Sequence, residues 1–599
     1  MTRLSSCILI PVFLPICAAF HYCPTGTTRA GDSAAATRSP PHPRAGLSSA
    51  ISVNGASMPP IGTCCGMSVT DDTNTADDIC ASSVEQTCKS IIHFNNAGAS
   101  PSPPIVVQTM TDHLAREVEL GGYLAAAQVQ SELDDVYASI HRLIHGDAAS
   151  SSGAGKNKLG GKQARKEIAL VESATVGWTR IFYSMAECLA RRARKEAALV
   201  SMASDHPVVL ERVILMSGAE YAANVVAAVK FCREQNEMLG HSNGARVRWR
   251  VLTIPSTTYV DLLGEIQSTG VVDTEALEKM MSGRWEMNDS DDAGKRGPKF
   301  LDPQSIAMVC VTHIPTNSGI INPVNEIGAI IEEHNARHNS EANTKNDSGF
   351  CLPQTLYLVD ACQSIGQIDV NVRDMHCHAL TATGRKYLRG PRGTGFLYAR
   401  HDIADELVPS HVDHAAAPLS AVPALSAKES VGGSSIDLTD SLEFGYQPGA
   451  ARFEFWESNV ASKMGLGAAV HYALDVGMTT IEEKCCQLGA ELRTRLCSID
   501  GVEVFHDNID KKGLSMSKQC GIVVFGVQGI DSSRIKTSLL DGGRDDSARF
   551  EVSVVPATST PVDSARTMTK DLVRASLSYE NTIEEIDEFV KRLEVVLGK

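Results

Sequence analysis

The stretch LTATGRKYLRGPRGTGFLY, residues 380–398, decides the fold because it places one long cationic side chain, Lys386, after a small and apolar segment. A glycine-rich basic loop follows the lysine, and the apolar run GFLYA after that loop is typical of a buried strand. Thr383, Gly384 and Gly390 leave room for another molecule to lie against the backbone. The pattern indicates a lysine held beside a binding space, and a surface lysine in a basic turn is the alternative.

Short apolar or β-branched runs separated by helical patterns recur on both sides of this stretch. They read IALVES from Ile168, RVILMS from Arg212, and then RVRWRVLTI, SIAMVCVT and LYLVD, each bounded by turn residues. Near-continuous apolar strands that alternate with helices are typical of a mainly parallel sheet covered on both faces. The expected fold class is therefore α/β, and ligands of such folds bind at the carboxyl ends of the strands.

Three strand ends carry groups that together suit one cofactor. Ser173, Ala174 and Thr175 begin a helix, where free N–H groups and the helix dipole favour a phosphate. Asp360 ends LYLVD, and Lys386 follows HALTAT. Pyridoxal 5'-phosphate (PLP) requires a phosphate seat, a carboxylate at its pyridine nitrogen and a lysine amine for a Schiff base. Taken singly, a helix N-cap and a strand-end Asp are ordinary features, but the three strand ends together predict a PLP site.

The chain resembles the class V aminotransferase and cysteine desulfurase-like family of fold-type I PLP enzymes, in segments that follow the family's order over residues 91–597. The resemblance implies a large PLP-binding domain with a mainly parallel seven-stranded sheet over residues 91–450, and a smaller C-terminal α/β domain over residues 451–599. The matching segments are HFNNAGAS from His93, ESAT from Glu172, AEYAANVV from Ala219, THIPTNSGIINP from Thr312, VDACQSIGQIDVNV from Val359, TATGRKYLRGPRGTGFLY from Thr381, RFEFWESN from Arg452 and VRASLSYENTIEEID from Val573.

The resemblance also implies a role for each matched position. Lys386 is the expected Schiff-base lysine, Asp360 the partner of the pyridine nitrogen, and Tyr221 the catalytic residue stacked on the ring where desulfurases have histidine. Because a phenol is a poorer proton shuttle than an imidazole at neutral pH, one acid/base role stays open. The other expected residues are Ala174, Thr175, Thr383 and Arg385 around the phosphate; Thr316, Asn317 and Gln363 at the cofactor's oxygen edge; Asn95, Asn96 and Arg574 for the substrate; and Glu457 and Asn459, which reach the partner's phosphate in a homodimer.

The reaction itself has several alternatives. The resemblance implies an enzyme acting at Cα or Cβ of an amino acid, by C–S lyase or β-elimination, epimerase or transaminase chemistry, and the substrate stays open. A non-catalytic homologue that serves as a binding or scaffold protein is the alternative class, and an intact set of Lys386, Asp360 and Arg574 disfavours it.

One feature bears on cysteine desulfurase activity in particular. Desulfurases of this family carry sulfur as a persulfide on a cysteine, on a loop upstream of the carboxylate-binding arginine. The corresponding residues, 552–574, contain no cysteine, and the last cysteine of the chain is Cys520, which is expected to be a buried strand-end residue. Because a serine or threonine hydroxyl cannot accept sulfur as a persulfide, the sequence predicts no persulfide-forming desulfurase.

Composition restricts the partners. A net charge of −16 over 599 residues disfavours nucleic acid and anionic membrane surfaces. The 17 cysteines form no CxxC pair, and most of them are interpreted as free thiols in a reducing compartment. The HCH segment at residues 376–378 could suggest a metal, but adjacent strand residues face opposite sides, so no metal is expected. The expected partners are a small amino acid and a second copy of the chain.

The N-terminal residues have the pattern of a targeting leader. Residues 1–19 combine a basic start, a short apolar run and small residues, as in a signal peptide. Residues 20–50 are rich in Ser, Thr, Ala and Arg, as in transit peptides, and residues 51–90 are interpreted as a linker. The two together predict import into the plastid of a complex-plastid alga, with the secretory pathway as the alternative, and no membrane insertion once the leader is removed.

Overall fold

The computed structural model describes most of the chain after the predicted leader. The leader and linker predictions over residues 1–90 lie outside the described residues. Within the described part, no helix combines the length and apolar character that a membrane span requires. The described residues are 91–146, 160–203, 208–238, 246–260, 266–287, 299–338, 353–420, 437–439, 442–505, 519–541, 548–563 and 570–599.

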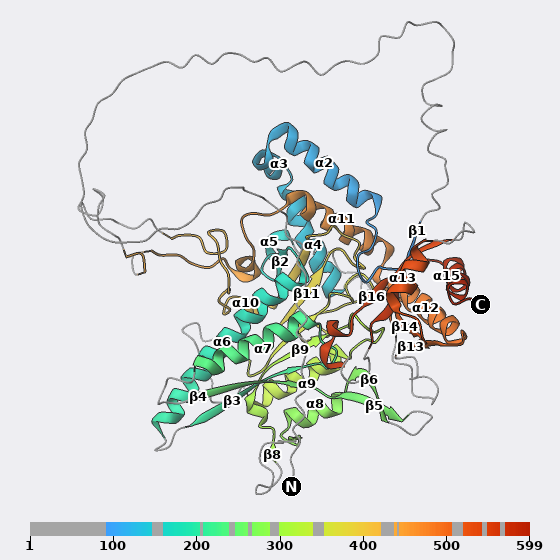
Figure 1. Ribbon diagram of the computed structural model, residues 1–599. Helices are drawn as coiled ribbons and strands as arrows, with labels where there is room; N and C mark the ends of the chain where they lie inside the picture. The colour runs from blue at the N-terminus through green and yellow to red at the C-terminus, as the bar shows by residue number, and fades with distance from the viewer. Residues whose placement is uncertain are drawn as a thin grey trace, which may run out of the picture. The chain divides into compact units, whose positions relative to one another are not determined.

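A seven-stranded sheet forms the centre of this part (Figure 1), in the order β2-β12-β11-β10-β9-β3-β4. β12 runs antiparallel to both of its neighbours, and the other adjacent pairs are parallel. The predicted mainly parallel seven-stranded α/β sheet is confirmed. Its strands are β2 (Ile168–Val171), β12 (Gly395–Ala399), β11 (Ala379–Thr383), β10 (Leu356–Asp360), β9 (Ile306–Thr312), β3 (Val209–Met216) and β4 (Arg246–Thr253).

The central strands are buried on both faces, which explains their continuous apolar runs. Every residue of β9, β10, β11 and β12 is buried. Alternate residues of β9 belong to different hydrophobic clusters: Val309 and Val311 to one, Met308 and Cys310 to the other. Since successive strand side chains point to opposite faces, the two clusters cover the two sides of the sheet.

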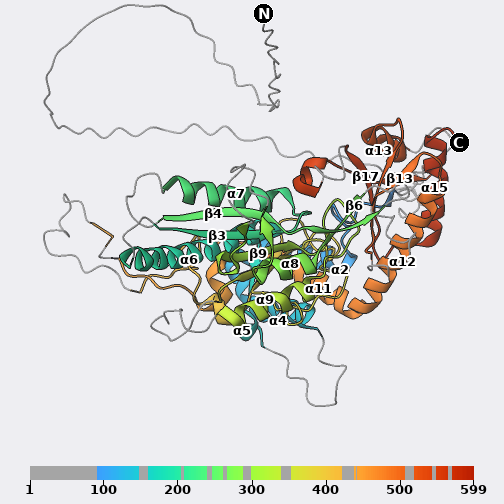
Figure 2. The same ribbon diagram turned by 90° about the horizontal axis from the view of Figure 1, so that it is seen from below.

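Helices cover each face. The helices α6 (Ala174–Met202) and α7 (Ala222–Glu237) contribute to one cluster, while α4 (Gln130–His145), α8 (Thr274–Met281) and α9 (Val324–His338) contribute to the other. Figure 2 shows α7 and α9 on opposite sides of the sheet. The apolar face of α6 is buried against the sheet, and its members are Trp178, Ile181, Phe182, Met185 and Leu189.

A second, antiparallel sheet lies in the C-terminal part, with its own hydrophobic core. Figure 1 shows the helices α12 (Met478–Cys497), α13 (Ser532–Asp541) and α15 (Ile583–Val596) gathered around it. Cys520 is buried just before β14, as predicted for a strand-end residue. The order of the strands is β13 (Val502–Val504), β14 (Ile522–Val527), β17 (Leu572–Ser576) and β16 (Ser553–Val555).

The first described strand joins this C-terminal part. β1 (Ile91–His93) pairs in parallel with β15 (Arg549–Glu551). Further along, α11 (Val460–Val476) packs against α2 (Pro104–Leu120) and α4. The remaining elements are α3 (Gly122–Gln128), α5 (Gly161–Ala164), α10 (His401–Ala404), β5 (Ser256–Val260), β6 (Ile266–Val272), β7 (Glu286–Met287), β8 (Lys299–Phe300) and the 3-10 turns Pro303–Ser305, Gly449–Phe453 and Ala557–Ser559.

The strand directions define two edges of the central sheet. The carboxyl ends of β9, β10 and β11 meet at one edge, which we call the carboxyl edge. In the β11–β12 ladder Thr383 pairs with Gly395, and Ala379 pairs with Ala399. Because β12 is antiparallel, Gly395 lies at the carboxyl edge and Ala399 lies at the opposite edge, which we call the amino edge.

Candidate active site

A cavity of about 250 Å³ opens at the carboxyl edge. Its walls come from the start of α6, the residues that follow β9, β10 and β11, and the strands β16 and β17 of the second sheet. Residues far apart in the sequence therefore meet at one place, as expected for the ligand site of a parallel sheet. The predicted site residues that line the cavity are Ala174, Thr175, Tyr221, Thr316, Asp360, Gln363, Arg385, Lys386 and Arg574.

Lys386 is the one lysine among the described residues that line this cavity. Burial lowers the pKa of its amine; the charges of Arg385 and Arg574 lower it further, and Cys362 and Asp360 oppose them. A lowered pKa increases the fraction of neutral amine at neutral pH, and the neutral amine is the nucleophilic form. The position following β11 therefore holds a lysine that is ready to form a covalent bond.

Asp360 is buried and held from two directions. Its Oδ2 accepts a hydrogen bond from Asn224 Nδ2 at 2.9 Å, and its Oδ1 accepts one from the backbone N–H of Cys362 at 2.9 Å. These donors fix the carboxylate as an acceptor facing the cavity. A carboxylate in this position can hold a protonated ring nitrogen of a bound molecule.

A buried carboxylate, Glu220, supports Asp360 through a shared amide. Asn224 Nδ2 also lies 3.2 Å from Glu220 Oε2, and Glu220 accepts from Ser217 Oγ at 2.6 Å and Thr312 Oγ1 at 2.7 Å. Burial raises the pKa of Glu220 to about 7. Neither Glu220 nor Asn224 was predicted as a site residue, although both lie in AEYAANVV: Glu220 precedes the N-cap of α7, and Asn224 lies in its first turn.

The phosphate seat predicted at the start of α6 has the expected local structure. Ser173 is the N-cap, and its Oγ accepts from the backbone N–H of Val176 at 3.2 Å. The first N–H groups of a helix have no partner within the helix, so those of Ala174 and Thr175 can face an anion. A Cβ on Gly395 would lie 2.5 Å from Ala382 O and 3.3 Å from Ala174 N, so glycine permits this close approach of helix and strand.

Arg385 and Arg574 give the cavity its positive charge. Arg385 Nη1 donates to Gly98 O at 2.7 Å, which holds the guanidinium at the wall. Burial lowers the pKa of Arg574 to about 10, so this guanidinium still carries its charge at neutral pH. Two cations beside one lysine suit a ligand with both a phosphate and a carboxylate.

Thr316 links the side chains of Arg574 and Gln363. Its Oγ1 accepts from Arg574 Nη1 at 2.8 Å and from Gln363 Nε2 at 3.2 Å. Within the described residues, Arg574 Nε and Gln363 Oε1 are buried with no hydrogen-bond partner. Buried polar groups are normally satisfied, so these two atoms fit a site that a polar molecule such as PLP or its substrate would complete.

Four other predicted residues lie close to the cavity but outside its lining. Asn96 Nδ2 donates to Ser576 O at 2.8 Å, and Asn95 Nδ2 donates to Glu551 Oε1 at 3.1 Å. Asn317 Nδ2 donates to Pro556 O at 3.1 Å, and Thr383 Oγ1 donates to Thr394 O at 3.3 Å. These side chains join neighbouring segments outside the cavity lining, and their ligand contacts stay predictions.

Glu457 and Asn459 also lie away from the cavity lining, and both are exposed. Asn459 is the N-cap of α11, where its Oδ1 accepts from the backbone N–H of Ser462 at 2.7 Å. Their contact with the phosphate of a second subunit stays a prediction.

Cys362 lines the cavity and was not predicted as a site residue. It follows Asp360 by two residues and lies beside Lys386. Burial raises the pKa of its thiol, and Lys386 only partly opposes this effect. Among the cysteines that the structure describes, Cys362 is the one in the lining, so any sulfur chemistry on the protein within the cavity would fall to it.

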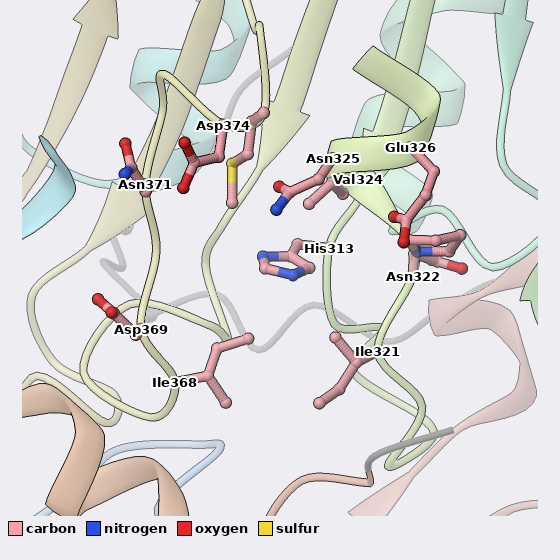
Figure 3. A pocket seen from close by; sticks show the side chains of 12 residues that line it. His313, Ile321, Asn322, Val324, Asn325, Glu326, Ile368, Asp369, Asn371 and Asp374 are labelled. Atoms are coloured by element: carbon pink, nitrogen blue, oxygen red, sulfur yellow. The ribbon is translucent and has the colours of Figure 1, made fainter. Parts of the chain in front are cut away.

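A second cavity, of about 320 Å³, lies beside the residue that follows β9 (Figure 3). Figure 3 shows the His313 imidazole in the middle, with Asp369, Asn371 and Asp374 to one side and Glu326 to the other. Burial lowers the pKa of His313 to about 4, so the ring is neutral at neutral pH. No lysine or arginine is among the described residues that line this cavity, so it lacks the cations that a phosphate requires.

The chain is similar to known PLP enzymes over most of its described length. A family model described as "Aminotransferase class-V" matches residues 352–416 and 420–589. A probable cysteine desulfurase of Methanothermobacter thermautotrophicus is 30% identical over 318 residues, which are 52% of this chain and 66% of that protein.

Solved structures with the same fold include a cysteine desulfurase and a C–S lyase. The apo structure of a cysteine desulfurase from Thermococcus onnurineus has a TM-score of 0.57 and 17% identity, covering 85% of this chain and 95% of that one. The cystine C–S lyase C-DES, in complex with its product cysteine persulfide, has a TM-score of 0.51 and 17% identity, covering 84% of this chain and 96% of that one. Another structure of C-DES is a variant with glycine covalently linked to the PLP cofactor. It has a TM-score of 0.52 and 17% identity, covering 87% of this chain and 99% of that one.

Proposed function

The chain belongs to the class V aminotransferase family of PLP-dependent enzymes, and from this premise we propose that it is a C–S lyase acting on cysteine or a cysteine derivative. One observation carries the proposal: the cavity joins Lys386, Asp360 and Arg574, while residues 552–574 contain no cysteine to take up sulfur. The names of the similar proteins, cysteine desulfurases and a cystine C–S lyase, support a sulfur-containing amino acid as the substrate class.

The cofactor is PLP, and the cavity residues fit it. When bound, PLP withdraws electrons from the substrate Cα and weakens the bonds to that carbon. The residues that would hold it are Ala174, Thr175 and Arg385 at the phosphate, Asp360 at the pyridine nitrogen, Tyr221 at the ring and Lys386 at the aldehyde carbon.

Lys386 and Tyr221 are the candidate proton carriers. Since burial lowers the pKa of the Lys386 amine, the neutral amine can accept the proton of the substrate Cα. Tyr221 lies at the start of α7 with 41% of its surface exposed, so its hydroxyl can exchange protons with water at the cavity. Loss of the sulfur group from Cβ then requires a proton for the leaving thiolate, which either group can supply.

The fate of the sulfur separates a lyase from a desulfurase. Ser553 and Ser559 are the described residues of the 552–574 segment that line the cavity with a side-chain hydroxyl, and a hydroxyl does not form a persulfide. Cys362 has a thiol, but burial raises its pKa and so disfavours the thiolate that would attack sulfur. Release of sulfide into solution is therefore the favoured outcome: cysteine and water give pyruvate, ammonia and hydrogen sulfide.

Product analysis tests this proposal. The purified PLP-loaded enzyme is incubated with a panel of amino acids that includes cysteine and cystine, and we expect pyruvate, ammonia and reduced sulfur in equal amounts. Alanine together with a stoichiometric, turnover-competent persulfide, mapped by alkylation and mass spectrometry, would show a desulfurase and overturn the proposal. A D-isomer or a 2-oxo acid that retains the substrate's sulfur would instead show epimerase or transaminase activity.

Arg574 is expected to hold the substrate carboxylate. Arg574→Ala should lower kcat/KM by roughly 10²–10³-fold, mainly through a higher KM, because loss of a buried charged hydrogen-bond partner costs about 2–5 kcal/mol. The kcat/KM of Arg574→Lys should lie between those of the unaltered enzyme and Arg574→Ala, since lysine keeps the charge but not the forked donor geometry. Steady-state kinetics at equal PLP occupancy measure both.

The matched control for Arg574 is Arg337→Ala, which removes an exposed arginine paired with Glu333 on α9. It should leave KM unchanged. If Arg574→Ala folds, binds PLP and keeps its KM, then another cation holds the carboxylate.

A further inference from the structure

Three side chains with metal-binding atoms meet at the amino edge of the central sheet: His141 and His145 of α4, and Glu167, which directly precedes β2. We call them the His–His–Glu cluster. Glu167 Oε2 lies 3.3 Å from His141 Nε2 and 3.6 Å from His145 Nε2. All three candidate ligand atoms lie within 4.8 Å of one another. No residue of the cluster lines the PLP cavity.

Ordinary helix and sheet geometry holds the cluster together. Residues four apart lie on one helix face, and the rings of His141 and His145 are stacked with centroids 3.7 Å apart and planes 13° apart. The backbone of Glu167 is fixed on both sides, because its N–H donates to Ala164 O at 3.0 Å and its carbonyl accepts from Ala399 N at 2.8 Å. The arrangement is therefore preformed, as a metal site requires.

The hydrogen bond of the other ring nitrogen decides which atom of His145 is free to bind. His145 Nδ1 lies 2.9 Å from the backbone carbonyl of His141, and a carbonyl only accepts, so Nδ1 carries the hydrogen. The neutral ring then presents the lone pair of Nε2 to Glu167 Oε2, which is also an acceptor. A cation between these two acceptors, whose side chains are only 8% and 16% exposed, would stabilise the pair.

The distances between the candidate ligand atoms fit a bound metal ion. A hydrogen bond between a ring nitrogen and a carboxylate oxygen measures about 2.7–3.2 Å, shorter than the 3.6 Å between His145 Nε2 and Glu167 Oε2. Four ligands at about 2.0–2.1 Å around a tetrahedral zinc ion lie roughly 3.3–3.4 Å from one another. The two separations in the cluster, 3.3 and 3.6 Å, are close to this value.

We propose that His141 Nε2, His145 Nε2 and Glu167 Oε2 bind a divalent cation of the zinc class, with the fourth coordination position open to water. Two imidazoles and one carboxylate suit zinc, whereas magnesium and calcium prefer oxygen ligands alone. His401 Nδ1 lies 3.2 Å from Glu167 Oε1, the other carboxylate oxygen, and so orients the carboxylate from outside the ligand set.

The site would join α4 to the start of β2. The metal binds the folded chain at a preformed site at the edge of the sheet opposite the catalytic lysine. We therefore expect it to raise the stability of the enzyme more than it changes the rate of catalysis. Saturating zinc should raise the Tm of the PLP-loaded enzyme by at least about 2 °C.

Zinc titration of the PLP-loaded enzyme tests the site. The enzyme is stripped with a chelator and titrated with zinc against a colorimetric competitor, and we expect one tight site per chain. Glu167→Gln and His145→Ala should each weaken that site by at least roughly tenfold, since loss of even an outer-shell partner costs 10- to 100-fold. Cobalt substitution should give the visible d–d bands of a tetrahedral nitrogen and oxygen site, without the charge-transfer band of a thiolate.

The matched control is His471→Ala, which removes a histidine whose Nε2 lies 2.6 Å from Asp135 Oδ2 in an exposed pair. It should bind zinc as the unaltered enzyme does. Circular dichroism and the PLP absorbance check that each variant is folded, and the conservative Glu167→Gln keeps the test valid should His145→Ala not fold. Equal affinity in the unaltered enzyme and the folded Glu167→Gln variant, or no tight zinc in the unaltered enzyme, would overturn the site.

Discussion

Lys386→Ala is expected to reduce turnover by several orders of magnitude and to remove the covalent bond between protein and cofactor. Lys386 is the one lysine among the described residues of the cavity lining, so no neighbouring amine can replace it. The unaltered enzyme should be yellow, and borohydride reduction should attach the cofactor permanently to the peptide that contains Lys386. Absorbance, peptide mass spectrometry and product assays together measure these effects.

A surface lysine provides the control for this substitution. Lys230 forms an exposed ion pair with Glu234 on α7, four residues away, so Lys230→Ala should change neither colour nor rate measurably. Full activity in a folded Lys386→Ala protein would refute the assignment of the catalytic lysine and leave the fold assignment intact.

Asp360→Asn should lower turnover by roughly 10²–10³-fold, the usual effect of removing one preorganised electrostatic group. The substitution keeps the size of the side chain and removes the charge opposite the pyridine nitrogen. It also turns one acceptor into a donor, against either the Asn224 amide or the Cys362 N–H. Rates are compared at equal PLP occupancy, which absorbance determines.

Asn224→Ala tests whether the hydrogen bond that orients Asp360 matters as much as the charge of Asp360. This variant leaves the carboxylate charged and removes one hydrogen bond of 2.9 Å, so its rate should fall by about tenfold, less than in Asp360→Asn. A larger loss in Asn224→Ala than in Asp360→Asn would mean that orientation matters more than charge at this position.

The fold was predictable because the central strands are buried on both faces. Such strands produce unbroken apolar runs, for example SIAMVCVT and LYLVD, which stand out from the amphipathic helices between them. The residues at the ends of the strands could be located for the same reason: Asp360 is the last residue of β10, and Lys386 follows β11. Local sequence determines that they lie at the carboxyl edge.

Side chains whose direction depends on distant segments were harder to predict. Asn96 was predicted to line the substrate entry, but its amide donates to Ser576 O and Asn581 Oδ1, which lie 480 and 485 residues later in the sequence. The Asn317 amide likewise donates a hydrogen bond to the backbone carbonyl of Pro556. Whether such a side chain faces a ligand or a neighbour depends on which strand packs beside it, and no short stretch of sequence contains that information.

The His–His–Glu cluster is a second case in which contacts between distant segments could not be predicted from the sequence. The spacing of His141 and His145 is visible in the sequence, yet two histidines four residues apart are common on helices and no metal was expected. Glu167 and His401 complete the arrangement only because Ala399, at the end of β12, pairs with Glu167 at the amino edge. The metal ligands therefore become recognisable only after the sheet is assembled.

The pairing of β1 with β15 has a consequence for synthesis of the chain. His93 and Glu551 are hydrogen-bonded across 458 residues, and Phe94 O accepts from the backbone N–H of Ser576 at 2.7 Å, two residues beyond Arg574. At about 5–20 residues per second, a ribosome needs on the order of half a minute to a minute and a half between these two strands. During that interval β1 has no partner, and Arg574 has not yet been made. The catalytic cavity can therefore close only after the residues up to Ser576 have been made, when the first described strand meets β15.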